Sequence, residues 1–534
     1  MNSKPLAQTV DLSSNSTSNS ARAMWQYLLG WGGILALATI LRLHRLHEVS
    51  AWYDEAAAWK TIQFSWSEMI QSIQQNVHPP VYYVFLKLWA GVFGDSPDAL
   101  RAFSVLCGVI TVVLIGVLVR EATDADAESP REGWFPLLAA ELYAINPMAI
   151  EQAQQARMYT LGILFAALLG WGTLRVLKKP LEWSGWILVI LFGNLLPLTH
   201  YYGFFTSLVA AVVIGFKMAE MWQENSVEVR NEVWARFGIA ILITLPVWII
   251  WGPVFYSQHA RVQAAYWIPP FSASWSEPFL YGAEWVSSPW IRDWGQFASI
   301  QLFLVCAAAA AVFIAKSPAR VRWVIAGFAF APPILSTLYS LASRNLLQGR
   351  YWSFAHLFFI VGIVVAVRGL SHVSVRRGVA AALIGWSLLW VVNDRGHRNL
   401  MAEQSGLRGA GETLRIVRLP DEPVLVASPF FHPSLQWSQS SPDRIYVPDS
   451  GGAYSHYEGG AILRKEEFLS LAAPLDSPTQ RLWVLADDHY SHSLEDPEKL
   501  SLPPEWKQVK TFQFYEGNRL PSSLELREYV RVMP

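Results

Sequence analysis

The carboxylates Asp54 and Glu55 stand next to each other, directly after the first long apolar stretch of the chain and the aromatic pair Trp52 and Tyr53. A carboxylate that is partly removed from water is suited to act as a general base on a hydroxyl group. The same residues would also suit a helix start, with Asp54 as the N-cap and Glu55 in the first turn. The spacing alone leaves both interpretations open.

A second polar cluster extends from Asn76 to Tyr83 and contains two consecutive prolines that restrict the backbone after His78. The cluster is consistent with a rigid turn, and equally with side chains that hydrogen-bond a polar ligand such as a sugar or a phosphate. His78 is also the residue considered for a divalent metal ion, although no second ligand stands at metal spacing. The sequence requires no other cofactor.

Polar residues also follow Asn146 and Pro147, a pair typical of a helix start, before an apolar stretch begins. Charged groups are costly in hydrocarbon, so this segment favours a cavity filled with water or substrate over contact with lipid. Gln154 and Arg157 are three residues apart, so on one helix they would share a face and could hold one anion. Alternatively, Arg157 and Tyr159 extend to the membrane interface.

Three further candidates stand near the ends of later apolar stretches. His200 ends one of them, where a belt of interfacial aromatic residues alone would account for the two tyrosines that follow. Arg350 and Tyr351 come directly before another, where the arginine could bind phosphate or reach the interface. Glu141 is a carboxylate inside a short apolar stretch, and the sequence names no partner for it.

The composition that surrounds these residues is typical of an integral membrane protein. Of the 534 residues, 52% are hydrophobic and 16% charged, whereas soluble domains have about a quarter charged residues. The formal net charge of −1 disfavours nucleic acid as a partner. The two cysteines, Cys107 and Cys306, predict neither a disulfide framework nor a thiolate metal cluster. The sequence contains no P-loop and no dinucleotide-binding glycine motif.

Eleven apolar stretches are candidate transmembrane helices. They lie near residues 24–43, 102–119, 134–146, 158–174, 184–198, 204–216, 237–252, 299–315, 323–341, 351–367 and 378–393. With a cytoplasmic N-terminus, the cytoplasmic loops carry 14 Lys and Arg in 60 residues, and the opposite loops carry 10 in 131. This bias predicts a multi-pass protein of the plasma (inner) membrane whose C-terminal part is extracytoplasmic.

The fold class predicted is an all-α polytopic membrane protein of about 11 transmembrane helices with a C-terminal soluble α/β domain. Residues 1–23 are expected to form a disordered cytoplasmic tail, residues 24–394 the transmembrane domain and residues 395–534 the soluble domain. The loop 44–100 is too long for a connector. It is expected to contain helices at the membrane interface, from Glu55 to about Gln75 and from Pro80 to about Phe93.

In the C-terminal part, short apolar runs predict strands near residues 424–427, 444–447 and 482–485. Arg464–Leu471 has a helical pattern. Lys510–Tyr515 and Leu524–Met533 are expected to close the domain as an antiparallel pair.

Four segments together resemble the polytopic GT-C glycosyltransferases of the dolichyl-phosphate-mannose protein mannosyltransferase type (glycosyltransferase family 39), which have the aminoarabinose transferase of lipid A as a bacterial relative. In order and spacing the segments cover most of residues 24–394, and the combination indicates a bacterial member. The segments are Trp52-Tyr53-Asp54-Glu55, His78-Pro79-Pro80-Val81-Tyr82-Tyr83, Gln154-Gln155-Ala156-Arg157-Met158-Tyr159 and Arg350-Tyr351.

The resemblance implies transfer of a hexosyl or pentosyl group from a polyprenyl-phosphate donor to an acceptor hydroxyl at the extracytoplasmic face, with inversion at the anomeric carbon. The acceptor would be a lipid, a glycan or a protein, and residues 395–534 do not resemble the β-trefoil insertion of the eukaryotic protein-modifying members. The alternative is a transporter or flippase of a lipid-linked glycan, for which repeated halves with broken helices would be typical.

The resemblance also implies a role for each candidate residue. Asp54 would be the general base, with Glu55 as the second catalytic carboxylate, and His78 with Tyr82 would line the donor site or hold a divalent ion. The residues expected to bind the donor phosphate or lipid are Gln154, Arg157, Tyr159, Arg350 and Tyr351. Those expected at the donor or sugar site are His78, Tyr82, Tyr83 and His200.

Overall fold

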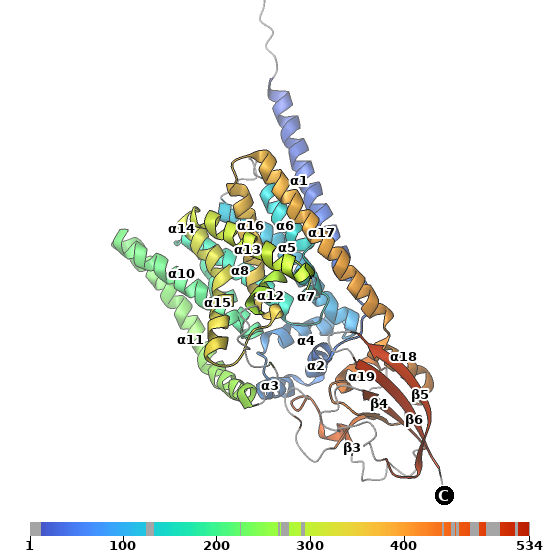
Figure 1. Ribbon diagram of the computed structural model, residues 1–534. Coiled ribbons are helices and arrows are strands. Elements are labelled where there is room, and N and C mark those ends of the chain that lie inside the picture. The colour runs from blue at the N-terminus through green and yellow to red at the C-terminus, as the bar shows by residue number, and fades with distance from the viewer. Residues whose placement is uncertain are drawn as a thin grey trace, which may run out of the picture.

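The protein is described here from a computed structural model. The residues that the structure describes are 12–123, 133–224, 226–264, 268, 277–289, 294–439, 443–449, 454, 459–469, 480–487, 502–517 and 522–532. A bundle of long helices makes up most of the molecule, and a small domain with a β-sheet packs at one end of it (Figure 1). Three short helices, α2, α3 and α4, lie between the bundle and the sheet.

Within the described residues, nine helical segments are long and apolar enough to cross a membrane. They are α1 (Leu12–Leu43), α5 (Pro97–Thr123), α8 (Tyr159–Lys178), α10 (Gly203–Glu224), α11 (Val227–Ala264), α13 (Trp294–Ala315), η1 (Arg322–Ala326) continued by α15 (Gly327–Ala342), η2 (Gly349–Trp352) continued by α16 (Ser353–Gly369), and α17 (Val373–Glu403). The other two predicted stretches are also helical, as α6 (Trp134–Ala144) and α9 (Trp183–Thr199), but they are shorter. The number of helices that cross the membrane stays a prediction.

Two helices extend past the predicted domain boundaries. Helix α1 begins at Leu12, so residues 12–23 are helical rather than a disordered tail; residues 1–11 lie outside the described part. An apolar helix that is already formed can be extended at little cost, because the unfavourable nucleation step has been taken. Helix α17 continues past residue 394 to Glu403, because the polar side chains of its last turns bind the segment after α1: Arg398 Nε donates to the carbonyl of His44 at 3.1 Å.

The loop between α1 and α5 contains three helices rather than two. They are α2 (Tyr53–Gln63), α3 (Trp66–Gln75) and α4 (Val81–Phe93). The predicted first helix divides because Ser65 starts a new one: its hydroxyl accepts from the amide of Glu68 at 3.4 Å, and the Glu68 carboxylate accepts from the amide of Ser65 at 2.9 Å. This break frees α2 to pack by itself against the soluble domain.

The soluble domain has a six-stranded sheet with the order β3-β2-β1-β4-β6-β5. The pairs β3–β2, β2–β1 and β1–β4 are parallel. Strand β6 is antiparallel to both β4 and β5. The elements are α18 (Gly406–Val417), β1 (Val424–Val426), α19 (His432–Ser438), β2 (Ile445–Pro448), η3 (Lys465–Glu467), β3 (Phe468–Leu469), β4 (Arg481–Asp487), β5 (Trp506–Glu516) and β6 (Ser522–Arg531).

The sheet confirms the predicted strands and the closing antiparallel pair, which is β5 with β6. The helix predicted over Arg464–Leu471 is wrong: a single 3-10 turn leads directly into β3, and residues 470 and 471 lie outside the described part. Glu467 turns its carboxylate toward Lys60 of α2 and toward the amide of Arg464. These bonds close a single turn, and the chain then enters β3.

The charge bias of the loops predicts that α2, α3 and the sheet domain lie outside the cytoplasm. Cysteines introduced at the exposed positions Ser67 and Gln508 should therefore react with a membrane-impermeant thiol reagent in intact cells. A cysteine at the exposed position His372, between α16 and α17, should react only after permeabilisation. The native Cys107 and Cys306 are buried and give little background. Reaction of the His372 variant in intact cells would reverse the predicted orientation.

Candidate active site

A cavity of about 1240 Å³ opens where the short helices, the bundle and the soluble domain meet. Apolar side chains from α10, α11 and the segment after α15 contribute to its lining, among them Phe204, Trp248, Phe255 and Leu346. The charged side chains of the lining come from other elements. Eight of the residues predicted as site residues line it: Asp54, His78, Tyr83, Arg157, Tyr159, His200, Arg350 and Tyr351.

Asp54 sits in the first turn of α2, and its carboxylate borders the cavity with about a quarter of the side chain exposed (26%). One carboxylate oxygen lies 3.4 Å from the guanidinium of Arg157. Asp54 is not the N-cap, since that position is taken by Trp52. The alternative that Asp54 serves as a helix cap is therefore wrong, and its side chain is left to face the cavity.

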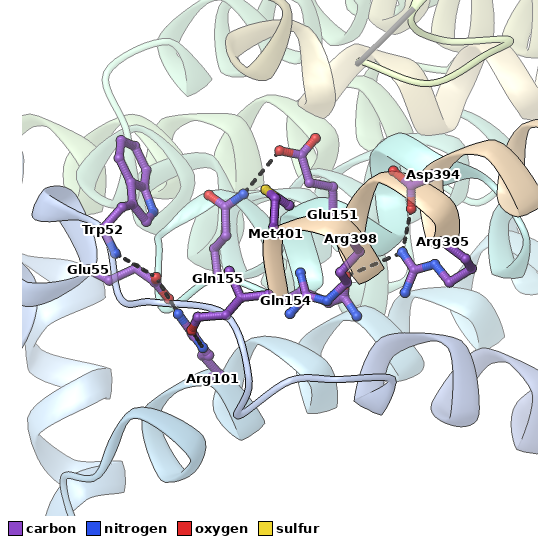
Figure 2. Close-up of a pocket in the computed structure, with 11 residues that line it drawn as sticks. Trp52, Glu55, Arg101, Glu151, Gln154, Gln155, Asp394, Arg395, Arg398 and Met401 are labelled. Atoms are coloured by element: carbon purple, nitrogen blue, oxygen red, sulfur yellow. Dashed lines mark hydrogen bonds and ion pairs between the residues drawn. The ribbon is translucent and has the colours of Figure 1, made fainter. Parts of the chain in front are cut away.

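Glu55 takes part in capping α2, the structural role that was considered for Asp54. It is the third residue of α2, its carboxylate accepts from the amide of Trp52 at 3.4 Å, and its side chain is 1% exposed. Figure 2 shows the carboxylate pointing at Arg101 of α5. The two groups form a paired interaction, with Arg101 Nε at 2.8 Å and Nη2 at 2.7 Å. Glu55 thus lies outside the lining of the large cavity, where a catalytic carboxylate was expected.

The Glu55–Arg101 pair joins three segments of the chain. Glu55 Oε1 accepts from the amide of Ala156 at 2.8 Å, one residue before Arg157. Arg101 donates to the carbonyls of Leu46, Val49 and Ser50 in the segment that leads to α2. Because the pair fixes both the start of α2 and the bend that carries Arg157, it holds Asp54 and Arg157 at their mutual distance.

Glu55→Gln is expected to lower the free energy of unfolding by about 3–5 kcal/mol, because it leaves the buried guanidinium of Arg101 without its counter-charge. The change should appear as a lower midpoint of thermal unfolding of the purified protein. Glu412→Gln is a matched control: this carboxylate pairs with Arg408 at 3.0 Å at the surface of α18 and should contribute ~1 kcal/mol or less. Equal midpoints for the two variants would contradict the assigned role of Glu55.

Arg157 lies in a bend between α7 (Pro147–Ala153) and α8, where Asn146 caps α7 as expected, accepting from the amide of Ala149 at 3.0 Å. The Arg157 side chain is 3% exposed. Its Nη1 donates to the carbonyl of Asp54 at 3.0 Å. Burial alone would lower the pKa of Arg157, but the carboxylate of Asp54 and the neighbouring tyrosines raise it, so the guanidinium stays charged.

Gln154 does not join Arg157 at the cavity. Helix α7 ends at Ala153, so the two side chains leave the chain in different directions. The side-chain amide of Gln154 donates to the carbonyls of Leu41, Arg42 and His44 at 3.1–3.2 Å, at and just after the end of α1, where the last carbonyls of a helix have no partner within it. It borders a separate polar pocket of about 20 Å³, drawn in Figure 2. The expectation that both residues hold one anion is wrong.

His78 contacts the guanidinium of Arg157, with 3.3 Å between Nε2 and Nη2. Because a guanidinium can only donate, Nε2 must be the unprotonated, accepting nitrogen. A cation bound at this nitrogen would replace that bond and would lie against the positive charge of Arg157. Among the described residues, no three His, Cys, Asp or Glu side chains form a group that could hold a metal ion. The arrangement does not fit a divalent ion at His78, and no step is derived through one.

The two tyrosines after the prolines have different surroundings. Tyr83 lines the cavity, and burial raises its pKa to about 12, so the hydroxyl stays protonated and can donate. Tyr82 is fully buried against the core, outside the cavity lining. Tyr82 was expected at the donor site, but on α4 only Tyr83 faces the cavity, because the two side chains leave the helix about 100° apart.

An aromatic cluster surrounds His200 at the turn between α9 and α10. The ring centroid of Tyr159 lies 5.7 Å from that of His200, and the centroid of Tyr351 lies 5.0 Å from it. Burial lowers the pKa of His200 well below its ordinary value, and the charges of His78, Arg157 and Arg350 lower it further. His200 is therefore neutral at physiological pH, so its ring can donate or accept a hydrogen bond without adding charge.

Arg350 enters the cavity from the 3-10 turn η2, far from Arg157 in sequence. Its guanidinium carbon lies 5.7 Å from the ring centroid of Trp52 and 5.6 Å from that of Tyr351. Two arginines and three carboxylates, those of Asp54, Glu151 and Glu284, thus line the cavity. Glu284 was not predicted from the sequence, because it comes directly after α12 (Glu277–Ala283) and carries no motif. Its carboxylate occupies the position that a Cβ on Gly349 would take, so a larger residue at 349 would displace this side chain.

The arrangement of spanning helices, interfacial helices and a soluble domain that share one cavity is the GT-C fold of membrane glycosyltransferases. The crystal structure of ArnT from Cupriavidus metallidurans in the apo state matches with a TM-score of 0.56 and 12% identity over 95% of this chain and 98% of that chain. The same protein bound to undecaprenyl phosphate matches with a TM-score of 0.52 and 12% identity, over 92% and 97%. At this identity the likeness shows the fold.

The family comparison points the same way. Residues 77–251 match the family described as dolichyl-phosphate-mannose-protein mannosyltransferase. The matched segment contains His78, Arg157 and His200, and it ends before Arg350. No sequence among the curated proteins matches this chain. The resemblance predicted from four short segments is confirmed by the fold and by this partial family match.

Proposed function

We propose that the protein is a membrane glycosyltransferase that moves a sugar from a polyprenyl-phosphate donor to an acceptor hydroxyl, with Asp54 as the general base. The observation that carries the proposal is the meeting of Asp54, Arg157 and Arg350 in one cavity that is mostly apolar elsewhere. ArnT of the same fold has been crystallised with undecaprenyl phosphate, which supports a donor of this class.

The two ends of the cavity suit the two ends of such a donor. The apolar wall from α10, α11 and the segment after α15 offers Phe204, Trp248 and Leu346 to a polyprenyl chain, which is stabilised by leaving water. The guanidinium groups of Arg157 and Arg350 suit a phosphate, because charge-assisted hydrogen bonds to phosphate are among the strongest in proteins. Tyr159 and Tyr351 lie beside these arginines, and Tyr83 and His200 supply hydrogen-bonding groups for the sugar.

The reaction is a single displacement. Asp54 takes the proton of the acceptor hydroxyl. At the same time the hydroxyl oxygen attacks the anomeric carbon of the donor sugar, and the bond from that carbon to the phosphate oxygen breaks. The electron pair of the broken bond stays on the phosphate, where Arg157 and Arg350 stabilise the added negative charge. One attack from the face opposite the leaving group inverts the anomeric configuration. The predicted orientation places this reaction at the extracytoplasmic face.

A transporter of lipid-linked glycans is the other candidate. Transporters tend to bind their substrate near the bilayer midplane between repeated halves. Here the charged groups gather at the end of the bundle beside the soluble domain, which favours transfer over transport.

Mass spectrometry of lipid extracts from cells with and without the protein tests the proposal. Loss of the transferase should cause a polyprenyl-phosphate sugar to accumulate and one surface glycan to lose a single sugar residue. Cells that carry the Asp54→Asn variant should match the deletion, and wild-type protein should restore both products. An unchanged set of lipid-linked sugars and glycans in the deletion would contradict it.

A further inference from the structure

The soluble domain is fixed to α2, the helix that carries Asp54. Lys60 of α2 is buried, and its ammonium donates to Gln436 of α19 at 2.7 Å and pairs with Glu467. The rings of Trp59 and Trp437 are stacked with 5.7 Å between centroids and an interplanar angle of 14°. Breaking a buried ion pair is costly, so the domain and α2 act as one unit.

Two connections of the sheet extend from this unit into the cavity. Phe430 lies in the turn Ser428–Phe431, which follows the carboxyl end of β1. Gly459 and Ile462 belong to the connection that follows the carboxyl end of β2. The Ser72 hydroxyl of α3 donates to the carbonyl of Ala461 at 2.7 Å and fixes this second connection in place.

The position of these connections in the sheet is informative. Strand β1 has β2 on one side and β4 on the other, all parallel, so the chain leaves β1 toward one side and later returns on the other. In open parallel sheets, ligands bind at the carboxyl ends of the strands where the strand order reverses. In this domain that edge faces the cavity that contains Asp54.

The surface at this edge is aromatic and uncharged. The ring of Phe430 stands edge-to-face against that of Tyr53, with 5.1 Å between centroids, and Tyr53 is the neighbour of Asp54. Gly459 has φ of +89°, and a Cβ there would lie 3.3 Å from the Tyr53 hydroxyl, so the absence of a side chain keeps the ring accessible. Among the described residues, the soluble domain contributes no charged side chain to the cavity lining.

We propose that Phe430, Gly459 and Ile462 form, with Tyr53, the acceptor subsite, and that it takes the ring of a neutral carbohydrate. This inference rests on the proposed function and names its acceptor class. The weakly polar C–H face of a pyranose packs on the face of an aromatic ring, whose electron density is negative. A ring held there by Tyr53 and Phe430 places its hydroxyl groups beside Asp54. The donor chain must lie among the membrane helices, so the wall made by the soluble domain is left for the acceptor.

Saturation-transfer NMR on the full chain in lipid nanodiscs tests the subsite. The probes are the methyl glycosides of glucose, galactose and mannose, with N-acetylserine methylamide as the peptide-like alternative. At least one glycoside should receive saturation at its ring C–H protons. Phe430→Leu keeps apolar volume but removes the ring, and should weaken that signal about three- to tenfold. Phe430→Trp should retain it.

The control is Tyr515→Ala, which removes an exposed aromatic ring on β5, outside the cavity lining. It should leave the glycoside signals unchanged. Signals that Phe430→Leu does not alter, or saturation of the serine derivative but of no glycoside, would overturn the proposal. Binding of undecaprenyl phosphate, measured on the same nanodiscs, separates the two proposals. If this lipid binds and the glycosides do not, only the acceptor subsite fails; if the glycosides bind through Phe430 and the lipid does not, only the proposed donor fails.

Discussion

Asp54→Asn is expected to reduce the rate of sugar transfer by about 10²- to 10⁴-fold, because the amide cannot accept the proton of the acceptor hydroxyl. Donor binding should change little, since the phosphate is assigned to Arg157 and Arg350. Stability should fall by less than in Glu55→Gln, because about a quarter of the Asp54 side chain (26%) is exposed to solvent and Arg157 keeps its bond to the carbonyl of Asp54. Turnover and donor KM of the purified variant, with its thermal unfolding midpoint, measure all three effects.

Asp98→Asn is the matched control, because Asp98 is an exposed carboxylate in the first turn of α5, outside the cavity lining. It should transfer sugar at the parental rate. A parental rate in the Asp54 variant itself would remove Asp54 from catalysis. Glu151 and Glu284 would then be the next carboxylates to test, because they line the cavity whereas Glu55 does not.

The fold was largely accessible from the sequence because the membrane imposes strong constraints on it. A helix that crosses hydrocarbon needs about 20 apolar residues, so the stretches are visible without any tertiary information. Polar residues at the ends of such stretches could be predicted as site residues for the same reason. Asp54, His78, Arg157 and Arg350 each stand beside an apolar segment, and the structure brings all four to one cavity.

The direction of individual side chains was not accessible, as Gln154 illustrates. The segment between Ala153 and Tyr159 contains residues with good helix propensity, so nothing local predicts the bend. The bend depends on bonds to distant residues: the amide of Ala156 donates to Glu55, and Gln154 donates to the end of α1. Tertiary contacts therefore override propensity at the point that aims Arg157 into the cavity.

The contribution of the soluble domain was hidden for a related reason. Lys60 and Gln436 are 376 positions apart, and no periodicity or motif links them. Phe430 in turn lies in a short turn whose sequence carries no functional pattern. Such residues acquire a possible role only through the packing that places a sheet edge over α2.

Arg157→Ala is expected to lower turnover by on the order of 10²-fold or more, which corresponds to about 2.7 kcal/mol of lost transition-state stabilisation. The negative charge on the leaving phosphate grows as the sugar bond breaks, so a buried guanidinium contributes most in the transition state. Arg157→Lys should restore activity only in part. The planar guanidinium can donate to the phosphate and to the carbonyl of Asp54 through different N–H groups, whereas the ammonium is a single point of charge that cannot bridge both acceptors in the same way.

The matched control for this substitution is Arg344→Ala, because Arg344 is an exposed arginine shortly before η2 whose guanidinium donates to Gln263. It should leave turnover and donor KM unchanged. The affinity of each variant for undecaprenyl phosphate separates two roles of Arg157. If Arg157 binds the phosphate, the alanine variant should lose affinity for this lipid as well as turnover. If it only orients Asp54, turnover should fall while the lipid binds as tightly as in the parent, and Arg350 alone would remain as the phosphate ligand.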